Sequence, residues 1–395
     1  MHLLIVTQKV DRADPVLGFF HAWIEEFAKH WDAITVICLA EGERSLPQNA
    51  RVFSLGKRVV QHSVLNKNKN VQHRVLNILT RRLVYTARFL RLIVATRRSY
   101  DCVFVHMNAE YVVLGGILWR LMGKRVALWY NHPARSLKVR IAAWFAHRIF
   151  YTSPQSFTAR YRRKARQMPV GIDTEQFRPG GRGPALSTEG VGSRPCSILI
   201  LGRISVYKRL HVIIDALKLL RERDIHCIAD IVGSEIPGEE TYAARMRDEA
   251  RELASAGFVH WLDGVPHKRT PQLFREHELY VNASEAGNFD KTILEAMSCG
   301  TLVLTSNPAL AETLPLPCRF QEGDADELAR KARYLLALRE VEKRRIGALL
   351  REYVVEHHTL AALAAQVRGA MSTYAVPLPT VKARKPHAGS ASLVL

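Results

Sequence analysis

Two short segments in the second half of the chain combine charged side chains with a position suited to an anion. In the first, Gly202-Arg203 ends an apolar run, and Lys208 follows five residues after the arginine. Arginine offers a planar fork of hydrogen-bond donors and lysine a point charge, so the pair suits a ligand with two phosphates. On its own, the pair more often represents solvated loop cations.

The second segment, residues 284–291, leads into a helix that we expect over residues 292–299. The first N–H groups of a helix have no intrahelical partner, so the helix start is a position that binds anions. We therefore expect Asp290, Lys291 and Thr292 to lie at a ligand.

Glu295 lies one helical turn beyond the start of this helix and shares a face with Lys291. A carboxylate there can accept hydrogen bonds from a ligand. The separation of four residues also allows an ion pair between the two side chains. Spacing alone leaves both interpretations open.

The elements that must position these segments recur as alternating strands and helices. Strand-like apolar runs occupy residues 2–7, 34–39, 103–106, 126–130, 197–201, 227–232, 259–262, 279–282 and 301–305. Helical periodicity occupies residues 19–29, 75–96, 210–220, 242–254 and 358–371. This alternation predicts an α/β fold with two doubly wound domains, whose ligands bind at the carboxyl ends of the strands.

The domain boundaries follow from a change in composition after Phe177, where glycine, proline and serine replace the apolar periodicity. We expect a first domain over 1–178, a linker over 179–195 and a second domain over 196–356. A C-terminal helix over 357–373 should pack back toward the first domain, and residues 374–395 should be disordered.

Positive charge is concentrated in the first half of the chain. The net charge is +20, and residues 1–180 hold 29 Lys and Arg against 11 Asp and Glu. Between residues 51 and 172 the only acidic residues are Asp101 and Glu110. Such a surface attracts anionic lipids, polyphosphates or nucleic acid.

The helix expected over 75–96 is the main basic element of this region. Its apolar residues recur at helical spacing, and arginines occupy the other faces. The apolar residues are Leu76, Leu79, Leu83, Ala87, Leu90 and Val94. Motifs typical of nucleic-acid binding are lacking, so we expect no nucleic-acid partner. We predict that residues 51–172 bind an anionic membrane surface.

The location and metal content are predicted from what the sequence lacks. No cleavable signal or membrane-spanning run of 18 apolar residues occurs, so we expect a cytoplasmic protein at the inner face of the membrane. The six cysteines form no CxxC pair and fit reduced core positions. We expect neither a metal site nor a cofactor, apart from a co-substrate.

Three motifs, in this order, resemble glycosyltransferase family 4. They are Pro169-Val170-Gly171-Ile172-Asp173-Thr174-Glu175-Gln176-Phe177, then Gly202-Arg203-Ile204 with Lys208, then Leu294-Glu295-Ala296-Met297-Ser298-Cys299-Gly300-Thr301. The resemblance covers roughly residues 1 to 370. It implies the GT-B fold, with two Rossmann-like domains facing each other across a cleft, and retaining transfer from a nucleotide-sugar donor.

The resemblance also implies roles for single residues. Arg203 and Lys208 would bind the donor diphosphate, and Glu295 would hydrogen-bond the ribose of the nucleotide. Gly18 matches a glycine turn that lets backbone approach the phosphate. His132 matches a histidine that faces the reacting sugar, and His106 is the other candidate for this role.

The sequence departs from the family pattern at one position. A glutamate eight residues before Glu295 is usual in the family, and this chain has Gly287 there. Asp290-Lys291 also replaces the usual pair of glycine and an apolar residue, and Glu285 and Asp290 are the nearby acids. The role in binding the sugar itself is therefore unassigned.

The function predicted from these observations is metal-independent, retaining hexosyl transfer to a cell-envelope polysaccharide or a lipid-linked acceptor. Preorganised cations would stabilise the charge of the leaving diphosphate. The alternatives are a sugar-nucleotide epimerase of the same fold and a non-catalytic, basic nucleic-acid-binding protein.

Overall fold

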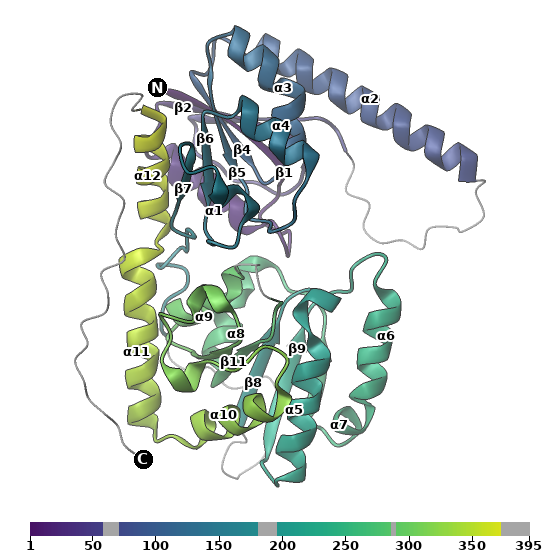
Figure 1. The fold of residues 1–395 in the computed structure, drawn as a ribbon, viewed down its shortest axis with the longest axis vertical. Helices are drawn as coiled ribbons and strands as arrows, with labels where there is room; N and C mark the ends of the chain where they lie inside the picture. Colours follow the sequence, from purple (N-terminus) through teal and green to yellow (C-terminus); the bar gives the residue numbers. More distant parts are fainter. Residues whose placement is uncertain (58–70, 181–195, 286–289, 373–395) are drawn as a thin grey trace.

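The computed structural model describes residues 1–57, 71–180, 196–285 and 290–372, which form two α/β domains stacked end to end (Figure 1). In the first domain, a seven-stranded parallel sheet has the order β3-β2-β1-β4-β5-β6-β7. Its strands are β1 (His2–Val10), β2 (Ala33–Glu41), β3 (Ala50–Ser54), β4 (Cys102–His106), β5 (Arg125–Trp129), β6 (Arg148–Tyr151) and β7 (Ala165–Gln167). Its helices are α1 (Phe19–Ala28), α2 (Val71–Ala95), α3 (Ala109–Leu121) and α4 (Leu137–Phe145), with the 3-10 turn η1 (Phe157–Arg160).

The second domain holds a five-stranded parallel sheet of order β10-β9-β8-β11-β12. Its strands are β8 (Cys196–Leu201), β9 (Cys227–Val232), β10 (Val259–Leu262), β11 (Leu279–Asn282) and β12 (Leu302–Thr305). Its helices are α5 (Leu210–Glu222), α6 (Glu240–Glu249), α7 (Arg251–Ser255), α8 (Thr270–Glu276), α9 (Lys291–Ser298), α10 (Ala325–Ala337) and α11 (Glu340–His357). The single helix expected over residues 242–254 is in fact divided between α6 and α7.

Both sheets are doubly wound, as the alternation of strands and helices predicts. In each sheet the strand order reverses at the first strand, between β1 and β4 in one domain and between β8 and β11 in the other. Loops that leave such neighbouring strands in opposite directions open a crevice at their carboxyl ends, where ligands of open α/β sheets bind. The loops after these four strands are therefore the candidate ligand-binding positions.

The last helices join the two domains. Helix α11 runs beside the second domain, and α12 (Leu360–Ser372) continues beside the first (Figure 1). Leu363 and Val367 of α12 are fully buried in the core of the first domain. Backbone hydrogen bonds of 2.8 Å also join Ile172 N to His358 O and Leu360 N to Ile172 O.

The string of residues 169–177 has a structural role at this junction. The Trp23 indole donates to Gly171 O (3.1 Å), and Gly171 has a φ of +76°. A Cβ on Gly171 would lie 2.5 Å from Leu363 Cδ2, so glycine is required there. The Phe177 carbonyl accepts hydrogen bonds from α9 and α11, through Ser298 and Arg351. The motif therefore connects the first domain with α9, α11 and α12.

Helix α2 is present where the sequence predicts a helix and, among its described side chains, it buries only one apolar face. Phe89 and Ile93 are fully buried, and the Phe89 ring packs edge-on against Trp119 of α3. Leu83 and Val94, which belong to the predicted apolar stripe, are exposed. Leu90 of the same stripe is half-buried against the core, so α2 has apolar residues on two faces and the face with Phe89 packs on α3.

Candidate functional site

The loop after β8 carries the first pair of predicted site cations. Gly202 has a φ of +147°, which favours glycine, and a Cβ on Gly233 would lie 1.8 Å from Gly202 O. Two glycines thus allow the loops after β8 and β9 to approach closely. The Arg203 side chain that follows is exposed, and Lys208 ends the 3-10 turn η2 (Val206–Lys208).

The loop after β11 meets this first loop, as the pairing of β8 with β11 requires. Glu285 N donates to Tyr207 O at 2.8 Å. The Lys208 ammonium forms an ion pair with the Asp290 carboxylate at the start of α9. The structure therefore brings together the two charged segments, which are about eighty residues apart in the sequence.

Asp290 is the centre of a hydrogen-bond network. Its Oδ2 accepts hydrogen bonds from Asn282 Nδ2 (2.8 Å) and Ser284 Oγ (3.1 Å), and its Oδ1 accepts from Thr292 Oγ1 (2.8 Å). Burial alone would raise the pKa of Asp290, but the Lys208 ammonium and these donors lower it to about 2. Asp290 is therefore a carboxylate at neutral pH, and it holds Lys208 in place.

Thr292 lies within this network at the first turn of α9. Its backbone N–H points to Asp290 Oδ1 at 3.3 Å, so Asp290 is the N-cap of the helix. The Thr292 hydroxyl also lies 2.5 Å from the hydroxyl of the fully buried Tyr280. The start of α9 is thus fixed from both β11 and the loop that follows it.

Glu295 is 2% exposed and has two cationic or potentially cationic neighbours. His267 Nε2 lies 2.9 Å from Glu295 Oε1, and Lys291 Nζ lies 3.8 Å from the same oxygen. The i, i+4 ion pair that the spacing allowed is therefore present. His267 belongs to the 3-10 turn η3 (His267–Arg269), and no sequence motif marked it as part of the site.

Phe19 connects the first domain to the cluster formed by Glu295, His267 and Lys291. Lys291 Nζ lies 4.0 Å from the centroid of the Phe19 ring, which is a cation–π distance. The Phe19 ring also meets His267 edge-on at 6.2 Å. The start of α1 thus faces the start of α9 across the domain boundary, and the cluster is built from both domains.

Gly18 lies immediately before α1 at this boundary. A Cβ on Gly18 would lie 2.4 Å from Asp14 O and 3.3 Å from the Cβ of His267. The loop it belongs to is held by Asp14, whose Oδ1 accepts from Val16 N (2.8 Å) and Leu17 N (2.7 Å). The loop therefore has no space for a side chain at this position.

We expect Gly18→Ala to lower the free energy of unfolding by about 1–3 kcal/mol, because the methyl group forces the loop to shift. Thermal unfolding of purified protein measures this loss. The control is Gly369→Ala in α12, where an added Cβ meets no atom within 4 Å. Equal melting temperatures for wild type and Gly18→Ala would contradict the steric role of Gly18.

Lys291 gives the site a pH-dependent contribution to stability. Burial lowers the pKa of Lys291 from 10.5 to about 8, although Glu295 and Asp173 raise it. Between pH 8 and pH 10.5 the unfolded chain binds a proton that the folded chain has released. Stability should therefore rise with pH over this range, relative to a variant without the amine.

We predict that Lys291→Met raises the free energy of unfolding at pH 7, and that this gain shrinks as the pH increases from 8 to 10.5. Chemical denaturation at several pH values measures both free energies. Lys218→Met, at a half-exposed position of α5 outside the site, provides the control. A difference between wild type and Lys291→Met that is constant with pH would contradict the lowered pKa.

The two candidate histidines have different environments. His106 is 3% exposed and stacks on Phe20 with ring centroids 4.1 Å apart. Burial, together with the charge of Lys291, lowers the pKa of His106 to about 3, so its imidazole is neutral. His132 is exposed, and its Nδ1 accepts a hydrogen bond from Ala134 N (3.0 Å).

The sugar end of the predicted site is described only in part. Gly287, where the family pattern has a glutamate, lies outside the described residues. Glu285 is half-buried at the edge of the described loop. The clearest contacts of the site are therefore those of Lys208, Asp290 and Glu295.

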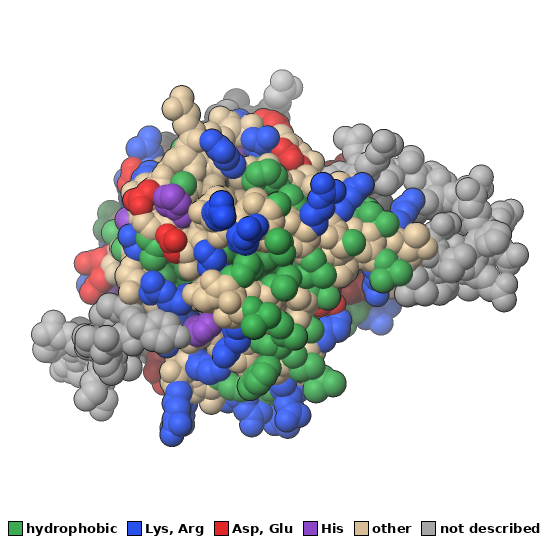
Figure 2. Space-filling view, turned by 90° about the horizontal axis from the view of Figure 1, so that it is seen from above, with side chains coloured by type: hydrophobic (Ala, Val, Ile, Leu, Met, Phe, Trp, Pro, Cys, Tyr) green, Lys and Arg blue, Asp and Glu red, His purple; other side chains and the backbone are tan. Residues whose placement is uncertain are grey.

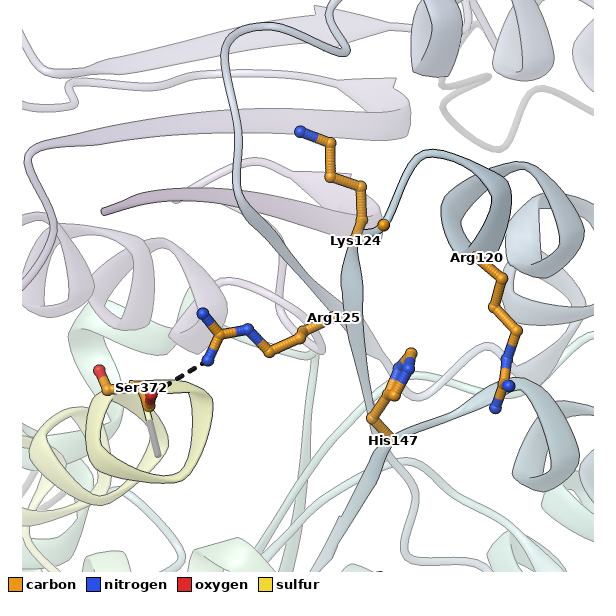
Figure 3. A pocket seen from close by; sticks show the side chains of 6 residues that line it. Arg120, Lys124, Arg125, His147 and Ser372 are labelled. Carbon is orange, nitrogen blue, oxygen red and sulfur yellow. Dashed lines mark hydrogen bonds between the residues drawn. The ribbon is translucent and has the colours of Figure 1, made fainter. Parts of the chain in front are cut away.

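A second basic hollow lies apart from the domain boundary, at the start of β5 (Figure 3). Arg125 donates to Ser372 O at the end of α12 (3.0 Å), and Arg120 donates to Trp144 O (2.9 Å) and Phe145 O (3.2 Å) at the end of α4. Cations at helix C-termini stabilise the helix dipole and the unpaired carbonyls. The contacts of Arg120 and Arg125 therefore have a structural explanation.

Part of the chain matches a known family. Residues 189–348 match the family of group 1 glycosyl transferases. The D-inositol 3-phosphate glycosyltransferase of Actinosynnema mirum is 29% identical over 143 residues, which are 35% of this chain and 34% of that protein. The enzyme of the same name from Pseudarthrobacter chlorophenolicus is 31% identical over 143 residues, or 35% of this chain and 33% of that protein. The match thus spans about a third of the length of these curated relatives.

Solved structures resemble the whole chain in fold. Anabaena HepE in complex with UDP and glucose has a TM-score of 0.69 at 18% identity, covering 94% of this chain and 99% of that one. The apo structure of OtsA has a TM-score of 0.73 at 11% identity, with 95% and 100% covered. The protein therefore has the GT-B fold, as the sequence predicts. Among the described residues, none of the helices has both the length and the apolar character needed to cross a membrane.

Proposed function

We propose that this protein is a retaining glycosyltransferase that takes a sugar from a nucleotide-sugar donor. The observation that supports this most directly is the meeting of the Lys208 loop with the start of α9 at the switch point of the second sheet. The match of residues 189–348 to group 1 glycosyl transferases covers the same loops. HepE, which shares the fold, has been solved with UDP-glucose, a donor of the proposed class.

Arg203 and Lys208 would bind the two phosphates of the donor. As the bond between the anomeric carbon and the β-phosphate oxygen breaks, negative charge develops on the leaving diphosphate. Fixed cations at this position stabilise that charge most in the transition state, which is how they accelerate the reaction. In this proposal the two side chains neutralise the diphosphate charge in place of a divalent ion. Activity should therefore persist in EDTA.

Asp290 would act as a positioning residue for the diphosphate site. Its carboxylate repels phosphate, but Oδ2 holds the Lys208 ammonium and Oδ1 caps α9. A lysine fixed in this way loses less conformational entropy when the donor binds. The backbone N–H of Lys291, at the first position of α9, would add a hydrogen bond to the anion. That of Thr292 is already donated to Asp290.

Glu295 would hydrogen-bond the ribose of the donor nucleotide. Its carboxylate is oriented by His267 Nε2 at 2.9 Å, so one of its oxygens is fixed before the donor arrives. Phe19 and Lys291 meet beside it, at the boundary of the two domains. The nucleotide would therefore be bound where closure of the domains can exclude water.

The sugar would be transferred with its anomeric configuration retained. The acceptor hydroxyl forms the new bond to the anomeric carbon on the face that the diphosphate leaves. Its proton passes to the leaving phosphate oxygen, and the products are a glycoside and a nucleoside diphosphate. We assign His132 to the reacting sugar because its imidazole is exposed, whereas the buried His106 packs behind Phe19 and Phe20.

The acceptor we propose is a cell-envelope polysaccharide or a lipid-linked sugar at the cytoplasmic face of the membrane. The experiment is incubation with a panel of nucleotide sugars, with and without such acceptors. We expect one donor to release its nucleoside diphosphate and to form a glycoside whose NMR coupling shows the donor configuration. An isomerised sugar nucleotide formed without acceptor would identify an epimerase instead. If no donor is bound, hydrolysed or transferred, the proposal fails.

A further inference from the structure

Two neighbouring helices of the first domain expose apolar side chains in regular stripes. On α3 the stripe consists of Leu114, Ile117 and Leu121, and on α4 of Leu137, Ile141 and Trp144. Each set follows helical spacing, so each lies on one face of its helix. Leu121 is 80% exposed and Trp144 is 68% exposed. Such exposure is unusual because burial of large apolar side chains is energetically favourable.

The two stripes are side by side. Helices α3 and α4 pack so closely that a Cβ on Gly116 would lie 2.5 Å from the ring of Phe145. The Arg120 guanidinium of α3 lies 5.8 Å from the Trp144 ring of α4. The stripes therefore form one apolar surface, which we call the α3–α4 surface and define by the six residues above. Large exposed patches of this kind mark interaction sites.

Positive charges border the α3–α4 surface. Arg140 of α4, with Arg162 and Arg163 after η1, lines a groove together with Leu137, Ile141 and Trp144. Among the described residues, these three arginines form no ion pair with an acidic side chain. Figure 2, which looks onto the end of the first domain, shows hydrophobic side chains gathered in a band with Lys and Arg around it.

The combination of chemistries is that of a surface which binds an anionic bilayer. Leucine, isoleucine and tryptophan insert at the boundary of head groups and acyl chains, and flanking arginines attract anionic head groups. Each cation near such a membrane adds to the attraction, and residues 51–172 hold 24 Lys and Arg against two acids. A second copy of the chain fits less well, because a two-fold interface would bring the same arginines face to face.

We propose that the α3–α4 surface docks the protein on an anionic membrane. The sequence-based prediction assigned membrane binding to residues 51–172, with the helix over 75–96 as the main basic element. The α3–α4 surface lies within that range. Helix α2 packs Phe89 and Ile93 on the core, and its Leu83 and Val84 are exposed. The proposal does not depend on the transferase activity, because binding to vesicles needs neither donor nor acceptor.

The test is sedimentation of the full-length protein with two kinds of vesicle. One consists of phosphatidylcholine alone, and the other also contains about 30% phosphatidylglycerol, which gives a strong negative surface charge. We expect binding to the anionic vesicles only, and at least tenfold weaker binding for the double variant Leu121→Gln, Trp144→Ser. Arg162→Gln with Arg163→Gln should weaken binding chiefly at low salt, because salt screens surface charges. Leu316→Gln, which changes a leucine 70% exposed in the second domain, is the matched control.

Three outcomes would overturn membrane docking. One is equal sedimentation with neutral and anionic vesicles. Another is unchanged binding of the Leu121, Trp144 variant, provided that its melting temperature is that of wild type. The third is a concentration-dependent dimer that the same variant disrupts, without vesicle binding, which would assign the surface to self-association. Release of nucleoside diphosphate from a soluble donor should be unaffected by all these variants, so failure here is distinct from failure of the transferase proposal.

Discussion

Lys208→Ala is expected to lower kcat by on the order of a hundredfold or more, with a smaller effect on the KM for the donor. The ammonium is most valuable when charge develops on the leaving diphosphate, so its loss raises the transition state more than the ground state. Steady-state release of nucleoside diphosphate measures both constants. Lys218→Ala removes another lysine of the same domain, outside the site, and should leave both unchanged.

Lys208→Ala also removes the ion-pair partner of Asp290. Without Lys208, the Asp290 carboxylate keeps its hydrogen bonds but loses its ion pair, which destabilises a buried charge. Lys208→Ala with Asp290→Asn removes that charge as well. If the double variant folds with wild-type stability and stays slow, the loss belongs to catalysis. If it regains the wild-type rate, the ammonium has no part in the reaction.

Glu295→Ala is expected to raise the KM for the donor by about 10- to 100-fold, because a hydrogen bond to a charged group contributes about 1.5–3 kcal/mol. The effect should fall on KM more than on kcat, since the ribose keeps its contacts throughout the reaction. A donor titration with the rate of diphosphate release as the signal measures this. Glu252→Ala, at an exposed position of α7, is the control.

A donor that contains deoxyribose tests whether Glu295 binds a ribose hydroxyl. If Glu295 binds a ribose hydroxyl, the wild type should bind the matching deoxynucleotide sugar more weakly, and Glu295→Ala should not distinguish the two donors. This comparison separates loss of the contact from loss of structure. Discrimination that persists in Glu295→Ala would place the ribose elsewhere.

The fold class could be predicted from the sequence because most of the parallel strands are short, continuous apolar runs. Leu3 to Val6 of β1, for example, are all fully buried. Strands β3, β6 and β7 were missed. Of these, β6 and β7 have only three or four residues, too few to distinguish a strand from a loop, and β3 is only half-buried. Which apolar face of α2 packs on the core was decided by tertiary packing, which the sequence pattern does not show.

The charged loops of the site could be predicted because they follow strands at the edge where ligands bind. The contacts between them could not. His267 precedes Glu295 by 28 residues and comes from a 3-10 turn with no recognisable motif, while Phe19 belongs to the other domain. The sequence predicted that Asp290 contacts the nucleotide-sugar donor. The structure shows that both of its carboxylate oxygens accept hydrogen bonds from protein groups.

The nucleotide end of the sugar donor is expected to bind between the β8 loop and the start of α9. A crystal structure with a bound nucleoside diphosphate would test this. We expect diphosphate oxygens within hydrogen-bond distance of Arg203 and Lys208, with a ribose hydroxyl at Glu295. A diphosphate bound instead in the basic hollow of Arg120 and Arg125, with the Lys208 loop empty, would contradict it.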